Sequence, residues 1–153
     1  MKPSVLLLLL LAADCASKDG FIDERVFDCE AGQLVTVQAG LDVPGARMEG
    51  MDDQHTLVVT VGNNGPQEIT VKAIRADQMP DALARYRFNS GYRNFDQVIP
   101  EGDDAEFRIP MAGRPVQPEV DSTGRSHQNV QFDVLVLLAN GDQYRCRFEI
   151  PMR

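Results

Sequence analysis

The chain has 153 residues, of which 43% are hydrophobic and 25% are charged. This length and composition fit one globular domain and exclude a disordered tail, a collagen and a solenoid array. Asp and Glu outnumber Lys and Arg by 23 to 15, which gives a formal net charge of −8. Because an acidic surface is repelled by phosphate backbones and by anionic lipids, the charge argues against nucleic acid as a partner and against general attraction to a membrane surface.

The N-terminal segment predicts export. Lys2 precedes an unbroken apolar run of nine residues, 5–13. A bilayer requires about 20 apolar residues, so this run is too short to cross one, but it has the length of a signal-peptide core. We therefore expect residues 1–16 to be a signal peptide.

The end of this segment leaves two alternatives open. The sequence Ala12-Ala13-Asp14-Cys15 resembles a bacterial lipobox, in which small residues precede a Cys that is lipidated. That resemblance implies an anchor on Cys15, although Asp14 stands where the pattern has Gly, Ala or Ser. The alternative is cleavage between Ala13 and Ser17, which would release a free periplasmic protein. The protein would contact the membrane only through a lipid on Cys15.

After a polar linker, residues 17–25, the remaining residues 26–153 are predicted to form one domain of short strands. Within each strand apolar and polar residues alternate, and Gly, Pro, Asn or Asp residues separate the strands. The predicted strands are residues 26–30, 33–38, 56–61, 68–76, 104–109, 130–139 and 142–150. In one of them, Ile69, Val71 and Ala73 fall on a single face that we expect to be buried.

Turn signals lie between these strands. Residues 62–66, Gly-Asn-Asn-Gly-Pro, predict a tight reversal. Asn140-Gly141 predicts a hairpin, because both central residues of a type I′ turn require positive φ. Pro110 is expected to end the strand before it. A short helix is predicted within residues 77–85, which contain Ala-Leu-Ala after a Pro.

About seven strands joined by turns predict an all-β domain, with an immunoglobulin-like antiparallel β-sandwich as the leading topology. Residues 57–66, together with Ile69-Thr70-Val71, are similar to the strand-turn-strand unit of bacterial Ig-like and CARDB-type adhesion modules. The resemblance implies this architecture and no activity, because that fold carries many functions.

Two of the three Cys residues are predicted to form a disulfide. Cys29 and Cys146 lie near opposite ends of the domain, and each falls on the apolar face of a predicted strand. Such a pair in an exported protein is oxidised. It would pin the first strand beside the last. A redox-active pair is the alternative, but that chemistry usually requires a close Cys-x-x-Cys spacing.

The sequence offers little for catalysis. Its two histidines are His55 and His127. Ser126 and His127 are neighbours in a predicted loop, but no nucleophile-elbow motif surrounds them and no third group is evident. We therefore predict that His127 is a solvated loop histidine, that the protein is not an enzyme and that it has no cofactor.

A copper site is the alternative function. Met48, Met51 and His55 fall within eight residues, and thioether and imidazole ligands suit copper(I) in an oxidising compartment. The carboxylates between them favour harder ions, and Met is also a common gap-filler in protein cores.

The segment 85–95 is a cationic and aromatic island in an acidic chain. Its residues 89–91, Asn-Ser-Gly, predict a turn that would make it a protruding hairpin. Arg and Tyr often anchor protein interfaces, so the candidate protein-binding residues are Arg85, Tyr86, Arg87, Tyr92 and Arg93. In the alternative, the aromatic residues pack on the sandwich and the arginines pair with carboxylates. We predict an exported, non-enzymatic cell-envelope interaction module whose partner is an unidentified envelope protein or another macromolecule.

Overall fold

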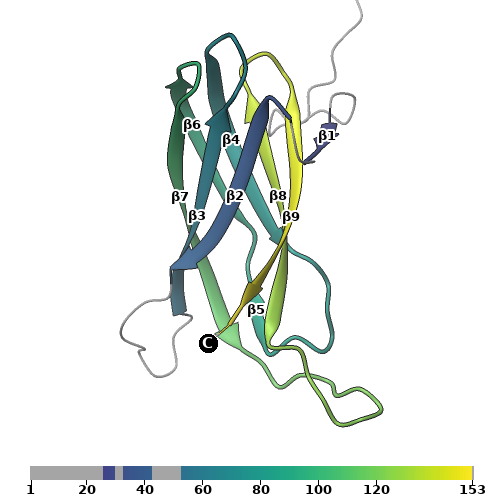
Figure 1. Ribbon diagram of the computed structural model, residues 1–153. Coiled ribbons are helices and arrows are strands. Elements are labelled where there is room, and N and C mark those ends of the chain that lie inside the picture. The colour runs from purple at the N-terminus through teal and green to yellow at the C-terminus, as the bar shows by residue number, and fades with distance from the viewer. Residues whose placement is uncertain (1–25, 30–32, 43–52, 153) are drawn as a thin grey trace, which may run out of the picture.

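The computed structural model describes residues 26–29, 33–42 and 53–152, and this part of the chain is all-β and forms two sheets (Figure 1). The predicted signal peptide, the linker and Cys15 lie outside the described residues. The strands are β1 (Val26–Asp28), β2 (Val35–Asp42), β3 (Asp53–Asn63), β4 (Ile69–Gln78), β5 (Tyr86–Phe88), β6 (Gly91–Ile99), β7 (Asp104–Pro115), β8 (Asn129–Leu138) and β9 (Gln143–Pro151). The described residues thus contain nine strands, where the sequence predicted about seven.

The two sheets pack face to face. One has the strand order β1-β9-β8-β4-β6 and the other has the order β2-β3-β7-β5. Alternating side chains of both sheets point inward and fill the space between them. The largest fully buried side chains are those of Phe107, Phe132, Leu57, Ile74, Ile99, Ile109 and Met111. Burying these side chains is the main source of the stability of the fold.

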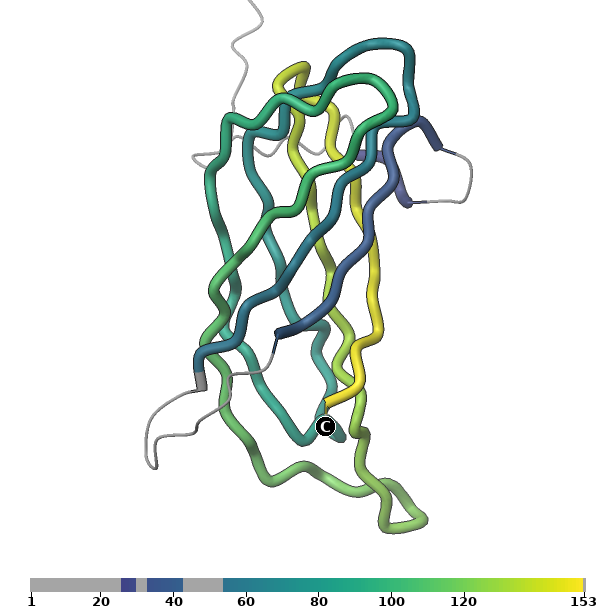
Figure 2. The backbone as a smooth tube through the Cα atoms, turned by 60° about the vertical axis from the view of Figure 1, so that its left-hand side comes forward, coloured from purple at the N-terminus to yellow at the C-terminus, as the bar shows by residue number. Residues whose placement is uncertain are grey.

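The loop between β7 and β8, residues 116–128, extends past the sheets at the end where β5 lies (Figures 1 and 2). The hairpin between β8 and β9 and the short strand β1 lie at the opposite end. Gly141, in the predicted Asn-Gly turn of that hairpin, has φ +89°, but no described residue other than glycine has positive φ, so Asn140 does not and the turn is not of the predicted type I′. Gly141 N–H donates to the Leu138 carbonyl at 3.0 Å, so the central residues of the turn are Ala139 and Asn140. We call the end that carries β5 and residues 116–128 the loop end, and the other the hairpin end.

Pro110 lies inside β7 and does not end it, contrary to the prediction. In this strand the carbonyls of Ala112 and Arg108 accept hydrogen bonds from outside the β3 ladder, from Asn89 N–H and from the Arg93 guanidinium. Even-numbered residues of β7 therefore direct their backbone groups away from β3. The missing N–H of Pro110 falls on that outer edge, where a strand tolerates proline.

β4 contains a bulge that changes which residues are buried. Its register with both neighbouring strands shifts between Val71 and Ala73. Because a bulge inserts one extra residue, the inward phase changes after it. Val71 and Ala73 are buried as predicted, and after the bulge Ile74 and Ala76 are buried as well.

No helix occurs among the described residues, so the prediction for 77–85 is wrong. β4 continues to Gln78, and the chain then makes a single turn in which Ala84 N–H donates to the Asp81 carbonyl at 3.2 Å. The Asp81 carboxylate also accepts from Leu83 N–H at 2.9 Å. This side chain competes for the backbone donor and favours a turn over a continued helix. The described residues therefore contain no helix that is long and apolar enough to cross a bilayer.

The predicted disulfide is present between Cys29 and Cys146, which are 117 residues apart in sequence, with 5.0 Å between their Cα atoms. It adjoins β1, which pairs with residues Gln143 to Arg145 of β9. This pairing is parallel, which the prediction of a wholly antiparallel domain did not include. A structural disulfide indicates an oxidising, exported compartment.

Candidate interaction surface

The three-residue strand β5 is anchored to the core by its first and last side chains. Tyr86 is 5% exposed, and its ring lies 4.8 Å from that of Phe88. The ring of the buried His55 meets both edge-on, at 5.2 and 5.1 Å, and Phe132 lies 5.3 Å from Phe88. Because Tyr86 and Phe88 point inward, the residue between them points outward.

A glycine makes room for these rings. Gly113 of β7 lies opposite Phe88 in the ladder. A Cβ atom built there would lie 2.6 Å from a carbon of each of the Tyr86 and Phe88 rings, closer than real contacts allow. The two rings therefore lie directly on the β7 backbone, and Gly113 is the residue that permits this close approach.

The free edge of β5 is capped by a side chain from the other sheet. The amide of Gln78, the last residue of β4, donates from Nε2 to the Tyr86 carbonyl at 2.9 Å and accepts at Oε1 from Phe88 N–H at 2.7 Å. It thereby occupies the position that the backbone of a neighbouring strand would take. On the other edge, Asn89 N–H donates to the Ala112 carbonyl at 2.9 Å. β5 is therefore hydrogen-bonded on both edges.

This anchoring presents two arginines to solvent side by side. Arg87 and Arg114 are directly opposite each other in the β5–β7 ladder, and both are exposed. Arg87 and Arg114, with Asn89 between β5 and β6, help to line a shallow hollow of about 260 Å³. Like charges directly opposite each other destabilise a strand pair. We call Arg87 and Arg114 the arginine pair.

Most other cationic side chains of the strands have a carboxylate nearby. Arg108, on the same face of β7, contacts Asp42 and Glu106. Lys72 contacts Asp96, and Arg75 and Arg145 contact Asp77 and Asp133 at 3.0 and 3.6 Å. Among residues 26–29, 33–42 and 53–152, neither arginine of the pair has an ion-pair partner. The pair is therefore a local concentration of positive charge on an acidic protein.

The structure does not bring all the predicted interface residues together. The segment 85–95 is not a hairpin, because β5 pairs with β7 whereas β6 pairs with β4 in the other sheet. Arg93 donates from Nη1 to the Arg108 carbonyl at 3.1 Å and lies over the Phe95 ring. Tyr92 is 43% exposed and donates from its hydroxyl to Asn94 Oδ1 at 2.7 Å. Arg93 and Tyr92 thus belong to the other sheet and its edge.

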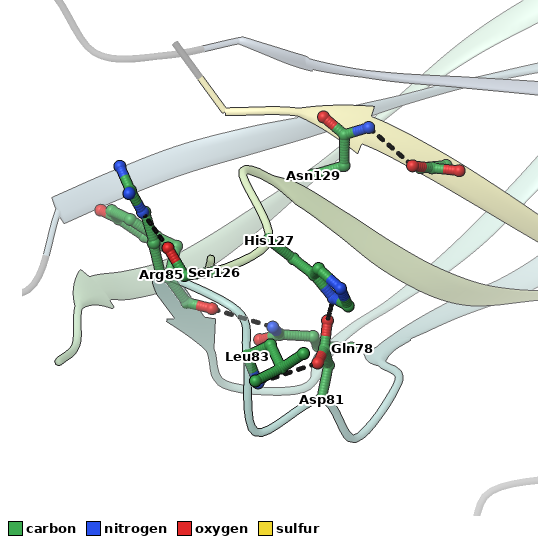
Figure 3. Close-up of polar contacts among 9 residues, drawn as sticks. Gln78, Asp81, Leu83, Arg85, Ser126, His127 and Asn129 are labelled. Carbon is green, nitrogen blue, oxygen red and sulfur yellow. Dashed lines mark hydrogen bonds and ion pairs between the residues drawn. The ribbon is translucent and has the colours of Figure 1, made fainter. Parts of the chain in front are cut away.

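Two loops meet beside β5 at the loop end (Figure 3). His127 N–H donates to the Leu83 carbonyl at 2.7 Å, and Arg85 N–H donates to the His127 carbonyl at 3.2 Å. His127 Nδ1 lies 2.7 Å from Asp81 Oδ2, and Arg85 Nε donates to Ser126 Oγ. The hydrogen bond from His127 holds the pKa of the Asp81 carboxyl below its ordinary value.

The loop contacts separate Ser126 from His127. Ser126 Oγ is engaged by Arg85, whereas the His127 ring turns toward Asp81 (Figure 3). Nucleophilic catalysis requires the base to lie within hydrogen-bond reach of the nucleophile. Here the Ser126 hydroxyl pairs with Arg85 and the His127 ring pairs with Asp81. His127 is solvent-exposed, as predicted for a loop histidine, although it also has a carboxylate partner.

The copper alternative rests mainly on Met48 and Met51, which lie outside the described residues. His55 is described, and it is buried among aromatic rings opposite Met111 in the β3–β7 ladder. Within the described part of the chain no group of three or more His, Cys, Asp and Glu side chains is placed to hold a metal ion. The copper site stays a prediction.

Sequence reasoning missed Arg114 and Gln78. Arg114 lies beyond the point where Pro110 was expected to end the strand, and it meets Arg87 only through the pairing of β5 with β7. Gln78 was assigned to the predicted helix. The signal that was available is the Tyr86-Arg87-Phe88 alternation, which has the period of a half-buried strand.

Neither a family model nor a curated protein matches this chain. The solved structures that are similar to it include the following two. The X-ray structure of Northeast Structural Genomics Consortium target SoR45 shares 8% identity at a TM-score of 0.46, over 78% of this chain and 87% of that one. The crystal structure of a FixG-related protein from Vibrio parahaemolyticus shares 9% identity at a TM-score of 0.39, over 79% of this chain and 98% of that one.

Proposed function

We propose that this chain is a non-enzymatic binding module of the bacterial cell envelope, either free in the periplasm or anchored to the outer membrane through Cys15. The apolar run 5–13 and the Cys29–Cys146 disulfide support export. The partner is a macromolecule that contacts the loop end.

An immunoglobulin-like topology is part of this proposal. Its support is that two consecutive strands, β3 and β4, lie in different sheets, as do β7 and β8, so that the chain crosses between layers in the manner of a Greek key. Sandwiches of this kind commonly bind partners through residues gathered at one end, on a rigid scaffold.

The observation that carries the proposal is the arginine pair. The backbone of Arg87 is fixed because the residues on either side of it, Tyr86 and Phe88, pack into the core. Arg87 faces Arg114, and among the described residues no carboxylate forms an ion pair with either arginine. Proteins accept such local violations of stabilising patterns chiefly at functional sites. Arg is also among the residues that most often dominate binding energy at interfaces.

The test is affinity capture from envelope extract with three forms of the mature protein. These are the wild type, the variant Arg87→Glu/Arg114→Glu, and the control Arg147→Glu, which changes an exposed arginine on β9 of the five-stranded sheet. We expect a protein retained by the wild type and the control but lost with the double variant. That protein is then purified, and its direct binding is measured by calorimetry. Equal recovery with all three forms would contradict the proposal.

A further inference from the structure

We propose that the arginine pair binds a carboxylate-rich, extended segment of a partner protein, with two acidic side chains at positions i and i+2. This inference rests on the proposed function and adds the chemistry of the partner.

The first argument is the charge that the fold leaves uncompensated. Arg108, on the same face of β7, contacts two carboxylates, whereas Arg114 faces Arg87. Guanidinium groups remain charged at any physiological pH, so the pair cannot relieve its repulsion by losing a proton. Carboxylates supplied by a ligand would relieve it and would form charge-assisted hydrogen bonds.

The second argument is preorganisation. The backbone of Arg87 is held between Tyr86 and Phe88, which the aromatic cluster and the Gln78 amide fix in place. Less conformational entropy is then lost when a ligand binds. The Gln78 amide also occupies the hydrogen-bonding groups on the free edge of β5, so the ligand cannot add there as a further strand. It lies across the face and contacts side chains.

The spacing fits an extended acidic segment. The Cα atoms of a hydrogen-bonded antiparallel pair are about 5.5 Å apart, and alternate side chains of an extended chain are about 6.6 Å apart. Because Arg side chains are long, they can accommodate the difference between these two spacings. Each planar guanidinium group can then bind one carboxylate through two hydrogen bonds. The shallow hollow beside the pair, which Asn89 also lines, leaves room for such a segment.

The surroundings favour a short acidic segment over a broad polyanion. Asp81 and Arg87 both line a second hollow, on the side of Arg87 where β4 ends, and Glu119 and Asp121 lie in the adjoining loop 116–128. At physiological ionic strength charges interact over about 8 Å. A phospholipid surface would therefore meet these carboxylates and the general charge of −8, whereas a peptide segment meets chiefly the arginine pair.

The direct test uses a fluorescein-labelled octapeptide of alternating Glu and Ser, with fluorescence anisotropy as the readout and the oxidised mature protein as the receptor. We expect saturable binding that weakens as salt is raised. Arg87→Glu and Arg114→Glu should each weaken it roughly tenfold or more, and Arg147→Glu should leave it unchanged. Arg87→Lys/Arg114→Lys keeps the charge and loses the forked donors, so it should bind with intermediate affinity.

A charge exchange makes the test specific to this pair. The double variant Arg87→Glu/Arg114→Glu should bind the corresponding Lys-Ser octapeptide and reject the Glu-Ser one. Absence of binding to the Glu-Ser peptide, or equal loss with Arg147→Glu, would overturn the inference. Binding of the wild type to phosphatidylglycerol vesicles, without binding to the peptide, would also overturn it. If the peptide fails while capture from extract still depends on the arginine pair, the proposed function stands and only the acidic partner is refuted.

Discussion

Among the described strands, β1 and β5 are the shortest, with three residues each, and they are held in place by different means. β1 lies at the edge of the five-stranded sheet, has two of its three residues exposed, and adjoins the Cys29–Cys146 disulfide. β5 lies at the edge of the four-stranded sheet and is held by buried rings and by the Gln78 amide. A covalent bond requires no packing around the strand it retains, whereas packing fixes the orientation of each side chain. β5 is consequently the strand that can present a side chain in a defined position.

Removal of the disulfide is the strongest way to break the β1 side of this comparison. For Cys29→Ser/Cys146→Ser we expect a loss of about 4 to 5 kcal/mol in the free energy of unfolding, because a bond that closes so long a loop restricts the unfolded chain. Urea denaturation measures this loss. Amide hydrogen exchange should show increased exchange in β1 and little change in β5. Equal increases in both strands would show that the two ends are not held independently.

The variant Gly113→Ala tests the packing beneath β5. A methyl group there meets the Tyr86 and Phe88 rings, and we expect a loss of about 1 to 3 kcal/mol from overpacking. Gly40→Ala in β2 is the matched control, because nothing lies within 4 Å of the Cβ position there. Thermal unfolding of both variants compares them. A loss no greater than that of the control would show that the rings can move aside.

The variant Gln78→Leu tests the cap on the free edge of β5. It leaves the Tyr86 carbonyl and the Phe88 N–H without the amide, and we expect a loss of about 1 to 3 kcal/mol because these groups are partly buried. Gln38→Leu, at an exposed position of β2, is the control. Denaturant midpoints, together with amide exchange at Phe88, give the measurement. Unchanged protection of that amide would argue that water replaces the cap fully.

The smallest expected effect has the opposite sign. Arg87→Glu places an acidic side chain opposite Arg114, and we expect a gain of about 0.2 to 1 kcal/mol in the free energy of unfolding. Arg108→Glu, on the same face of β7, should be destabilising because it loses its carboxylate contacts. The two variants are compared by thermal unfolding at low salt, and the difference should shrink as salt is added. Destabilisation by both would mean that Arg87 is already neutralised.

Much of the fold could be predicted from the sequence. A strand with one buried face shows alternating apolar and polar residues, and two Cys residues on apolar faces have few possible partners. Val59 and Phe107 are examples of the first, and the Cys29–Cys146 bond of the second. The arginine pair could not be predicted. Its members come from different parts of the sequence, and only the docking of β5 on β7 makes them neighbours. Alternation also hides a bulge such as the one at Val71 to Ala73, since its phase change depends on the neighbouring strands.

The position of β1 bears on how an N-terminal anchor would orient the domain relative to a membrane. Val26 pairs with Gln143, close to the hairpin end, whereas the arginine pair lies at the loop end (Figure 1). A tether attached through the N-terminus would therefore hold the sandwich by its hairpin end and would point Arg87 and Arg114 away from the lipid headgroups. With such a tether the length of the sandwich would act as a spacer that holds the binding surface away from the bilayer.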